Sequence, residues 1–399
     1  MDVSRLFTPE FHADPYPIYR EMREEGRLLE VGGMESWIAT GYEEVFTILR
    51  DARFKSGFSR SDNAYDRQWQ ARSPVTFEFF HRNMLGANPP DHTRLRGLVS
   101  RAFTPRRVES LRPRVESIVS KLLDEVAPRG RMDVVQDFAY PLPLTVIAEL
   151  LGVPVEDREK LKAWSQPFTR ILDGMTRDAY LEEAEAAALE MNAYFREQFE
   201  RHRQRPGDDL IDGLLAAHDE GDRLSEDELL STCLLLLVAG HETTTNLVGN
   251  GLLGLLRHPE QWERLRAQPE LAPSAVEECL RYDAPVQFTS RRPWEDVELF
   301  GRTVPGDMEV ILVLGAANRD PARFPDPDRL DIGRADNTHL AFSQGIHFCL
   351  GASLARLEAE VALRGLSRRF PEMELACETV SYRPGFAIRA LEALPVDLG

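Results

Sequence analysis

The sequence predicts a mainly α-helical fold with small β-sheets, and two observations carry this prediction. Helix signals dominate the 399 residues, whereas only segments 36–40, 297–300 and 309–314 combine strand-forming residues with turn residues at their ends. No internal repeat, low-complexity tract or long Gly/Ser linker divides the chain. We therefore expect a single α-rich domain over residues 1–399.

The best-marked helix opens with a capping box, in which Ser225 is the N-cap and Glu228 follows three residues later. Its apolar pattern continues to about Arg257, and Pro259 then stops the helix. A helix of about 30 residues would be about 45 Å long and would cross the whole domain. Two polar breaks before it predict surface turns, at 206–209 and 219–222.

Composition and charge limit the partners of the protein. The chain carries 66 acidic against 48 basic residues, a formal net charge of −18, which argues against binding to nucleic acid or to an anionic membrane surface. The N-terminal sequence holds no apolar core of signal-peptide type. The longest near-apolar run, Cys233 to Gly240, is far shorter than the about 18 residues of a membrane span. We expect a soluble cytoplasmic protein with no membrane anchor and no nucleic-acid partner.

Four cysteines are spread along the chain without C-x-x-C spacing, so neither a disulfide framework nor a zinc site is predicted. Three of them lie in apolar or helical surroundings and are predicted to be core thiols: Cys233, Cys279 and Cys377. Cys349 differs, because Gly345 and Gly351 bracket it and an amphipathic helix follows. Glycines let the backbone approach a ligand closely, and nearby amides with the positive end of a helix lower a thiol pKa.

Two other interpretations of Cys349 stay open from the residues alone. It could be a small buried hydrophobe, as free cysteines often are, or a nucleophile paired with His347. The spacing F-x-x-G-x-H-x-C-x-G is far more specific than a lone cysteine, and it resembles the haem-ligand loop of the cytochrome P-450 family. The resemblance spans nearly the whole chain, from 14–16 to 391–395, and is closest to soluble bacterial members.

This resemblance implies a cytochrome P-450 fold, a single triangular α-rich domain around a buried haem b (iron protoporphyrin IX). Cys349 would ligate the iron as a thiolate, which pushes electron density onto the metal and favours O–O cleavage. Other loop residues would contact the cofactor: Phe342, Gly345, His347 and Gly351.

The middle of the long helix reads Ala239-Gly240-His241-Glu242-Thr243-Thr244. Buried polar groups are costly unless hydrogen-bonded, and Gly240 costs about 1 kcal/mol relative to alanine inside a helix. Thr243 can bond back to the carbonyl of Ala239 or Gly240 and open the helix for a small ligand. A packing notch with a surface glutamate is the alternative. The string resembles the family's oxygen-binding groove, which implies that Ala239 and Gly240 contact the cofactor and that Glu242 and Thr243 deliver protons. Many relatives carry aspartate where Glu242 stands.

Glu278 and Arg281 lie three residues apart on one predicted helix face. A surface ion pair of this kind is common and weak. Its position before the cysteine loop resembles the family's Glu-x-x-Arg motif, which implies a three-membered ion network. Either Arg329 or Arg334 could be the third member, and the sequence does not choose between them.

A haem carries two propionates, so its pocket needs cations or hydrogen-bond donors at the rim. His92 and Arg96 are four residues apart and share a helix face. Together with Arg291 and His347, they match the family's propionate contacts. Taken singly, each could equally be a solvated cation.

The resemblance implies a haem-thiolate monooxygenase that inserts one atom of dioxygen into an apolar small molecule. The branch it suggests holds macrolide hydroxylases and the fatty-acyl-cleaving enzyme of biotin synthesis, so a polyketide, a fatty acyl chain or a terpene-like compound is expected. Electrons would come from a separate ferredoxin or flavodoxin. A peroxygenase, a haem-based sensor or carrier, and a cysteine hydrolase are the alternatives.

Two further patterns bear on the partners. Residues 94–115 carry seven arginines against one acid, Glu109, which predicts either a docking surface for an acidic electron donor or a solvated helix face. Six phenylalanines predict either an apolar substrate cavity or plain core packing: Phe77, Phe79, Phe80, Phe168, Phe288 and Phe386.

Overall fold

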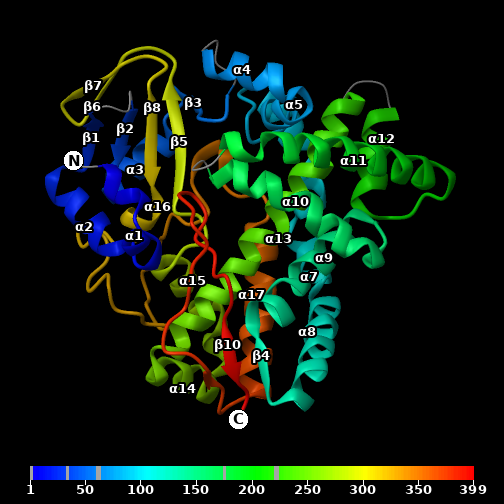
Figure 1. Cartoon of the computed structure of the whole chain (residues 1–399), viewed down its shortest axis with the longest axis vertical. Coiled ribbons are helices and arrows are strands. Elements are labelled where there is room, and N and C mark those ends of the chain that lie inside the picture. Colours follow the sequence, from blue (N-terminus) through cyan, green and yellow to red (C-terminus); the bar gives the residue numbers. More distant parts are fainter. Residues whose placement is uncertain (1–2, 33–35, 60–63, 174–176, 220–223) are drawn as a thin grey trace. The chain divides into compact units, whose positions relative to one another are not determined.

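Helices make up most of the chain and small sheets the rest, as predicted (Figure 1). The computed structural model describes residues 3–32, 36–59, 64–173, 177–219 and 224–399. The chain forms two compact units, a first of 1–57, 108–142 and 243–399 and a second of 58–107 and 143–242. Three helices contain boundaries between the units: α7 (Pro105–Ser110), α9 (Pro141–Leu151) and α13 (Glu226–Leu256). A single domain over 1–399 stays a prediction.

A five-stranded sheet of order β1-β2-β8-β5-β3 lies in the first unit. Its strands are β1 (Leu28–Val31), β2 (Ser36–Ala39), β3 (Phe54–Ser56), β5 (Phe288–Pro293) and β8 (Glu309–Val313). β2 and β8 pair in parallel, and the other neighbours are antiparallel. Along β8, Val310 and Leu312 enter one apolar cluster while Ile311 and Val313 enter another, because side chains alternate between the faces of a strand. Two of the three predicted strands are thus confirmed as neighbours in this sheet.

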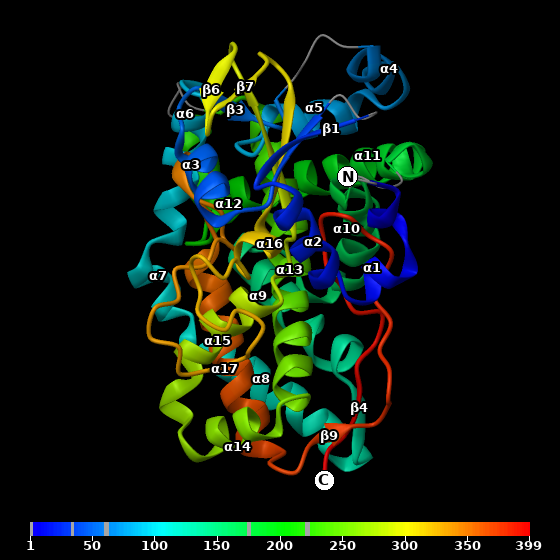
Figure 2. The ribbon, with the colours of Figure 1, turned by 90° about the vertical axis from the view of Figure 1, so that its left-hand side faces the viewer.

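Two smaller sheets complete the β structure of the described residues. β6 (Val297–Leu299) and β7 (Arg302–Val304) form an antiparallel pair, which confirms the third predicted strand. β4 (Arg131–Asp133), β10 (Pro395–Asp397) and β9 (Glu374–Leu375) form a sheet that includes the end of the chain (Figure 2).

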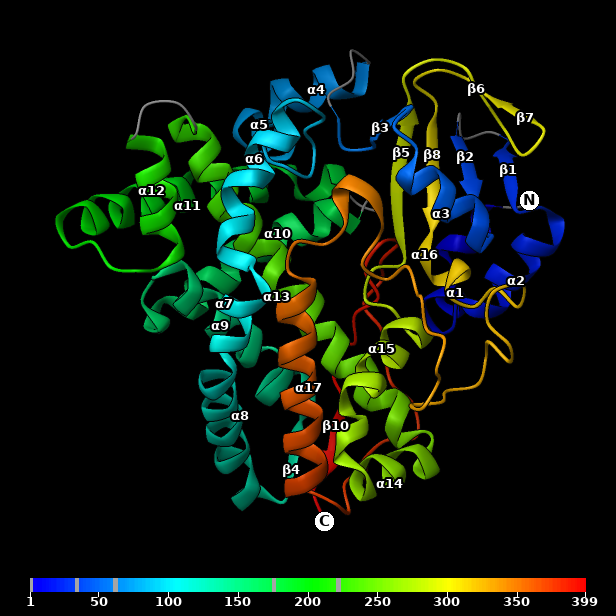
Figure 3. The same ribbon diagram turned by 180° about the vertical axis from the view of Figure 1, so that it is seen from behind.

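The remaining helices of the first unit are α1 (Pro9–Ala13), α2 (Tyr16–Glu25), α3 (Tyr42–Arg50), α8 (Arg112–Val126), α14 (Pro259–Ala267), α15 (Ala272–Tyr282), α16 (Leu314–Ala317) and α17 (Ala352–Arg369). α17 packs along α8 and also contacts α14 and α15 (Figure 3). A Cβ at Gly365 would lie 2.7 Å from a methyl of Val119, so glycine permits the close approach of α17 and α8. This packing fixes α17, whose N-terminus follows Cys349 by three residues.

The helices of the second unit are α4 (Ala64–Arg72), α5 (Pro74–Arg82), α6 (Asp91–Val99), α10 (Arg158–Asp173), α11 (Arg177–Gln204) and α12 (Leu210–Asp219). α11 packs against α10, α5 and α12. No helix among the described residues has both the length and the apolar character needed to cross a membrane.

The long helix predicted from the capping box is α13, with 31 residues. The Ser225 amide donates to Glu228 Oε2 at 2.8 Å, and the Glu228 amide donates to Ser225 Oγ at 3.2 Å. The helix ends at Leu256, and Pro259 opens α14. The predicted break at 206–209 is confirmed as a connection between α11 and α12, while most of 219–222 lies outside the described residues.

Candidate active site

Cys349 lies in a loop that backbone hydrogen bonds close on itself. The Cys349 amide donates to the Phe342 carbonyl at 2.9 Å, and the Phe348 amide donates to the Gly345 carbonyl at 3.1 Å. Gly351 is the N-cap of α17, so the cysteine stands just before the positive end of an 18-residue helix. The thiol is half-buried. The loop therefore presents an accessible sulfur where negative charge is stabilised.

The other cysteines differ from Cys349. Cys233 and Cys279 are 0% and 3% exposed, and burial raises the pKa of both thiols. Their prediction as core thiols is confirmed, and the same interpretation is wrong for the half-buried Cys349. For Cys377 the prediction is wrong, since it lies beyond the short strand β9 and is half-buried.

The two glycines of the loop have different roles. Gly345 has φ +73°, and a Cβ there would lie 2.4 Å from the Leu49 carbonyl oxygen at the end of α3. Glycine at 345 is thus required by the protein's own packing. Gly351 has φ −83°, and a Cβ there would meet no protein atom within 4 Å. The protein's own packing therefore does not require glycine at 351.

Arg291 on β5 is a buried cation that lacks a carboxylate partner within the described part of the chain. It is 4% exposed, and its guanidinium donates to the Ser290 carbonyl at 2.8 Å. Burial lowers its pKa to about 10. Because a buried charge is costly without a counter-charge, this guanidinium fits an anionic group such as a haem propionate.

The middle of α13 is open on one face. Ala239 is exposed and Gly240 and Thr243 are half-buried, whereas Glu242 is only 4% exposed. Ala239 and Thr243 are four residues apart and therefore share that face. The alternative of a surface glutamate is wrong. The packing role of Gly240 is confirmed, because a Cβ there would lie 3.2 Å from the Ile147 side chain of α9. The bond from Thr243 back to a helix carbonyl stays a prediction.

His241 is a buried polar residue that the sequence argument passed over. It is 0% exposed, with Nδ1 2.7 Å from the Leu237 carbonyl oxygen and Nε2 3.3 Å from Ser165 Oγ of α10. Its Nε2 also lies 4.0 Å from Glu242 Oε2. The signal for it was available, since a histidine inside a Leu/Val-rich helix needs polar partners.

The Glu278–Arg281 pair is fully buried. Arg281 donates to both carboxylate oxygens of Glu278 at 2.8 Å. The Arg334 Nε lies 3.2 and 3.3 Å from the same two oxygens, whereas Arg329 offers its backbone carbonyl to Arg281 at 3.0 Å. The third side chain of the network is therefore Arg334.

Residues 28–376 match the family model described as cytochrome P-450. The chain belongs to the cytochrome P-450 family. The biotin biosynthesis cytochrome P-450 of Bacillus subtilis is 45% identical over 99% of this chain and 98% of its own length. The cytochrome P-450 monooxygenase PikC of Streptomyces venezuelae is 45% identical over 97% of this chain and 92% of its own length.

Solved structures similar to this chain are also cytochromes P-450. P450BioI in complex with acyl carrier protein ligated to hexadec-9Z-enoic acid has a TM-score of 0.92 and 44% identity, and the match covers 98% of this chain and 100% of that one. A myxobacterial cytochrome P-450 in complex with myristic acid has a TM-score of 0.91 and 46% identity, covering 99% of each chain. The predicted fold is confirmed. The protein is a haem b enzyme of the class that incorporates oxygen.

Half of the predicted cofactor contacts lie in one loop of the first unit: Phe342, Gly345, His347, Cys349 and Gly351. Phe342 and His347 lie within ten residues of Cys349, and His347 ends a short turn that starts at Gly345. His92 and Arg96 both lie on α6 in the second unit, where His92 is buried and Arg96 half-buried. Their contact with propionates stays a prediction, as does that of Arg291 and His347.

The aromatic residues expected near substrate pack mainly on one another. In the second unit, Phe79 lies 4.8 Å from Phe80 and 4.9 Å from Phe168, measured between ring centroids. In the first unit, Phe288 and Phe386 stack at 4.0 Å with an interplanar angle of 6°. Five of the six phenylalanines are buried, as the core-packing interpretation predicts, whereas Phe386 is half-buried. An apolar substrate cavity lined by any of them stays a prediction.

Acids from distant segments neutralise part of the arginine-rich stretch. Arg94 pairs with Glu228 at 2.5 Å, and Arg107 lies 3.3 Å from Asp208. In the first unit, Glu109 and Glu360 both pair with Arg112. These pairs leave fewer than the seven arginines available to a partner. Two remain exposed without an ion pair to any described residue: Arg101 and Arg106.

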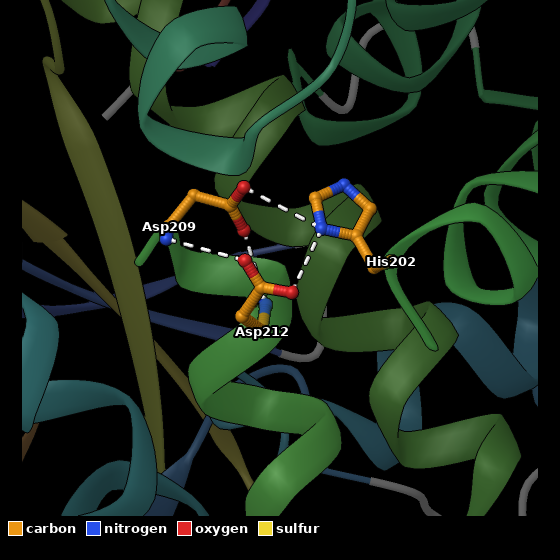
Figure 4. A group of neighbouring side chains, drawn as sticks. All are labelled: His202, Asp209 and Asp212. Atoms are coloured by element: carbon orange, nitrogen blue, oxygen red, sulfur yellow. Dashed lines mark hydrogen bonds and ion pairs between the residues drawn. The ribbon is translucent and has the colours of Figure 1, made fainter. Parts of the chain in front are cut away.

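The second unit also holds a histidine–carboxylate group (Figure 4). His202 Nδ1 lies 3.0 Å from Asp212 Oδ1 and 3.4 Å from Asp209 Oδ2, and Nε2 lies 3.1 Å from the Gly152 carbonyl oxygen. Both ring nitrogens thus face acceptor oxygens. The group ties the end of α9 to α11 and α12, and we assign it a structural role.

Proposed function

We propose that this protein is a haem-thiolate monooxygenase whose iron ligand is Cys349. The observation that carries the proposal is the loop itself, which presents a half-buried thiol before α17, whereas Cys233 and Cys279 are fully enclosed. When bound, haem supplies activation of dioxygen, one atom of which enters the substrate. Phe342, Gly345 and Gly351, in the same loop as the ligand, would contact the cofactor.

Four residues are the proposed contacts of the haem propionates: Arg291, His347, His92 and Arg96. Arg291 supplies a buried guanidinium that needs an anion. His347 lies in the ligand loop, and His92 and Arg96 contribute from one face of α6.

Residues in the middle of α13 would deliver the protons that the reaction needs. Thr243 carries its hydroxyl there, next to Ala239 and Gly240, whose small side chains leave room for dioxygen. Glu242, which is buried beside Thr243, would replace the proton that the Thr243 hydroxyl donates. Burial shields Glu242 from bulk water, so its proton would have to come through positioned groups.

The proposed substrate is a fatty acyl chain or a macrolide-like polyketide. Two similar structures support a fatty acyl substrate: P450BioI was solved with a hexadecenoyl acyl carrier protein, and a myxobacterial cytochrome P-450 was solved with myristic acid. A macrolide-like substrate is supported by 6-deoxyerythronolide B hydroxylase of Saccharopolyspora erythraea, which is 43% identical over 99% of both chains. The electron donor is a ferredoxin or flavodoxin that docks through Arg101 and Arg106, which the structure leaves exposed. Spectral titration with myristic acid, a fatty acyl carrier protein and a macrolide distinguishes the substrate classes.

The test of the ligand is the spectrum of the reduced protein with carbon monoxide. Wild type should show the strongly red-shifted Soret band of thiolate-ligated haem, and Cys349→Ala should lose it. Cys279→Ala is the matched control, because that thiol is enclosed in the same unit, and it should keep the band. A wild-type band in Cys349→Ala would overturn the proposal.

A further inference from the structure

We propose that Glu277, His339 and Arg356 form a clamp that positions Phe342, the first residue of the ligand loop, and thereby holds Cys349 in its ligating geometry. The inference rests on Cys349 being the iron ligand. All members of the clamp belong to the first unit, and the Glu278–Arg281–Arg334 network uses none of them.

The centre of the clamp is the Glu277 carboxylate of α15. Arg356 of α17 donates to it twice, from Nε to Oε1 at 2.6 Å and from a terminal nitrogen to Oε2 at 2.9 Å. His339 Nε2 lies 3.2 Å from Oε2. A bidentate pair of this kind fixes the plane of the guanidinium as well as its place.

The fixed guanidinium covers the Phe342 ring. Arg356 Cζ lies 4.6 Å from the ring centroid, within the range of a cation–π contact. Within the loop, the Phe348 ring meets the Phe342 ring edge-on, with 6.4 Å between the ring centroids. The Phe342 ring therefore contacts both an arginine that is itself anchored and a residue next to Cys349.

The backbone connects this ring to the thiol. The Phe342 carbonyl accepts the Cys349 amide at 2.9 Å, so any shift of Phe342 moves the bond that closes the loop. The Ala341 amide donates to His339 Nδ1 at 3.2 Å, which places the ring proton on Nε2, where it faces Glu277. His339 thus ties the segment before Phe342 to the same carboxylate that anchors Arg356.

The charge state of Glu277 supports a permanent clamp. Burial by itself raises its pKa, but hydrogen bonds from His339 and Arg356 outweigh burial and hold the pKa at about 2. Glu277 is therefore an anion at neutral pH, and Arg356 remains paired whenever the loop is folded.

The test compares Arg356→Lys and Glu277→Gln with the control Arg364→Lys. Arg364 lies on the same helix and pairs with Glu360 at 2.9 Å. Lysine keeps the charge of Arg356 but loses the planar, bidentate donor. The measurement is the rate at which the reduced carbon monoxide complex loses its thiolate Soret band at mildly elevated temperature, with far-UV circular dichroism recorded on the same samples.

Both clamp variants should initially show the thiolate band and lose it about tenfold faster than wild type, as expected for loss of one charged hydrogen bond, while helix content stays intact. Arg364→Lys should match wild type. If both clamp variants lose the thiolate band at the wild-type rate, the clamp proposal is wrong. The assignment of Cys349 as the ligand would not be affected, because only Cys349→Ala tests it. Band loss that merely follows loss of helix content would also overturn it, because the role would then be general stability.

Discussion

Glu358 offers a sharp test of the electrostatics of α17. The side chain is 1% exposed, and its Oε2 has no hydrogen-bond partner among the described residues. Burial raises its pKa from 4.5 to about 8. Replacement by glutamine, which has nearly the same shape, removes the ionisable proton and leaves the packing of the helix in place.

The size of the effect on the free energy of unfolding follows from the raised pKa of Glu358. Each pKa unit corresponds to about 1.4 kcal/mol, so ionising Glu358 in the folded state costs up to about 5 kcal/mol. Because the folded pKa is raised, the stability that the neutral acid contributes is complete below pH 4.5 and is lost as pH rises to about 8. Within that window the free energy of unfolding should fall by about 1.4 kcal/mol per pH unit through this one group.

The assay is urea unfolding of wild type and Glu358→Gln, followed by far-UV circular dichroism at pH 5, 6, 7 and 8. The difference in free energy of unfolding, variant minus wild type, should increase steadily with pH. Its value at any single pH includes the cost of burying the new amide, so the slope carries the test. Parallel stability curves for the two proteins would refute the reasoning.

Other predictions concern the network, the loop and the helix. Arg281→Met should lower the free energy of unfolding by about 3–5 kcal/mol in urea, because it leaves the Glu278 carboxylate buried with one cation fewer; an unchanged midpoint would contradict this. Gly345→Ala should cost at least about 1–3 kcal/mol from the positive φ alone, measured the same way, and tolerance of alanine would show that the loop can move away from Leu49. Thr243→Ala should keep the thiolate band but slow product formation about 10²-fold and divert electrons to peroxide, so product per electron equal to wild type would reduce Thr243 to a packing residue.

The features predicted correctly from the sequence are those with local causes. The capping box at Ser225 and the proline at 259 set the ends of α13 through neighbouring residues, so their reading did not depend on the rest of the fold. The ligand loop is also local, since its closing hydrogen bond joins Phe342 to Cys349 across only a few residues.

The features that were missed depend on contacts between distant segments. Arg329 and Arg334 are both close to the network, and only the folded chain decides that one offers its carbonyl and the other its guanidinium. The charge of the arginine-rich stretch was overestimated because Glu228, more than a hundred residues away, pairs with Arg94. A count of charges along the sequence cannot include such partners.

The two neighbouring glutamates of α15 show how the fold supports its ligand loop. Glu278 turns inward, where Arg281 and Arg334 enclose it, and its Oε1 also accepts the Asp331 amide at 2.9 Å. Glu277, one residue earlier, faces His339 and Arg356 instead, because successive helix positions point about 100° apart. One turn of a single helix thus holds both the segment that leads to the loop and the helix that leaves it. Since the loop between them carries the thiol, rigidity there comes from side chains of α15 as much as from the loop's own hydrogen bonds.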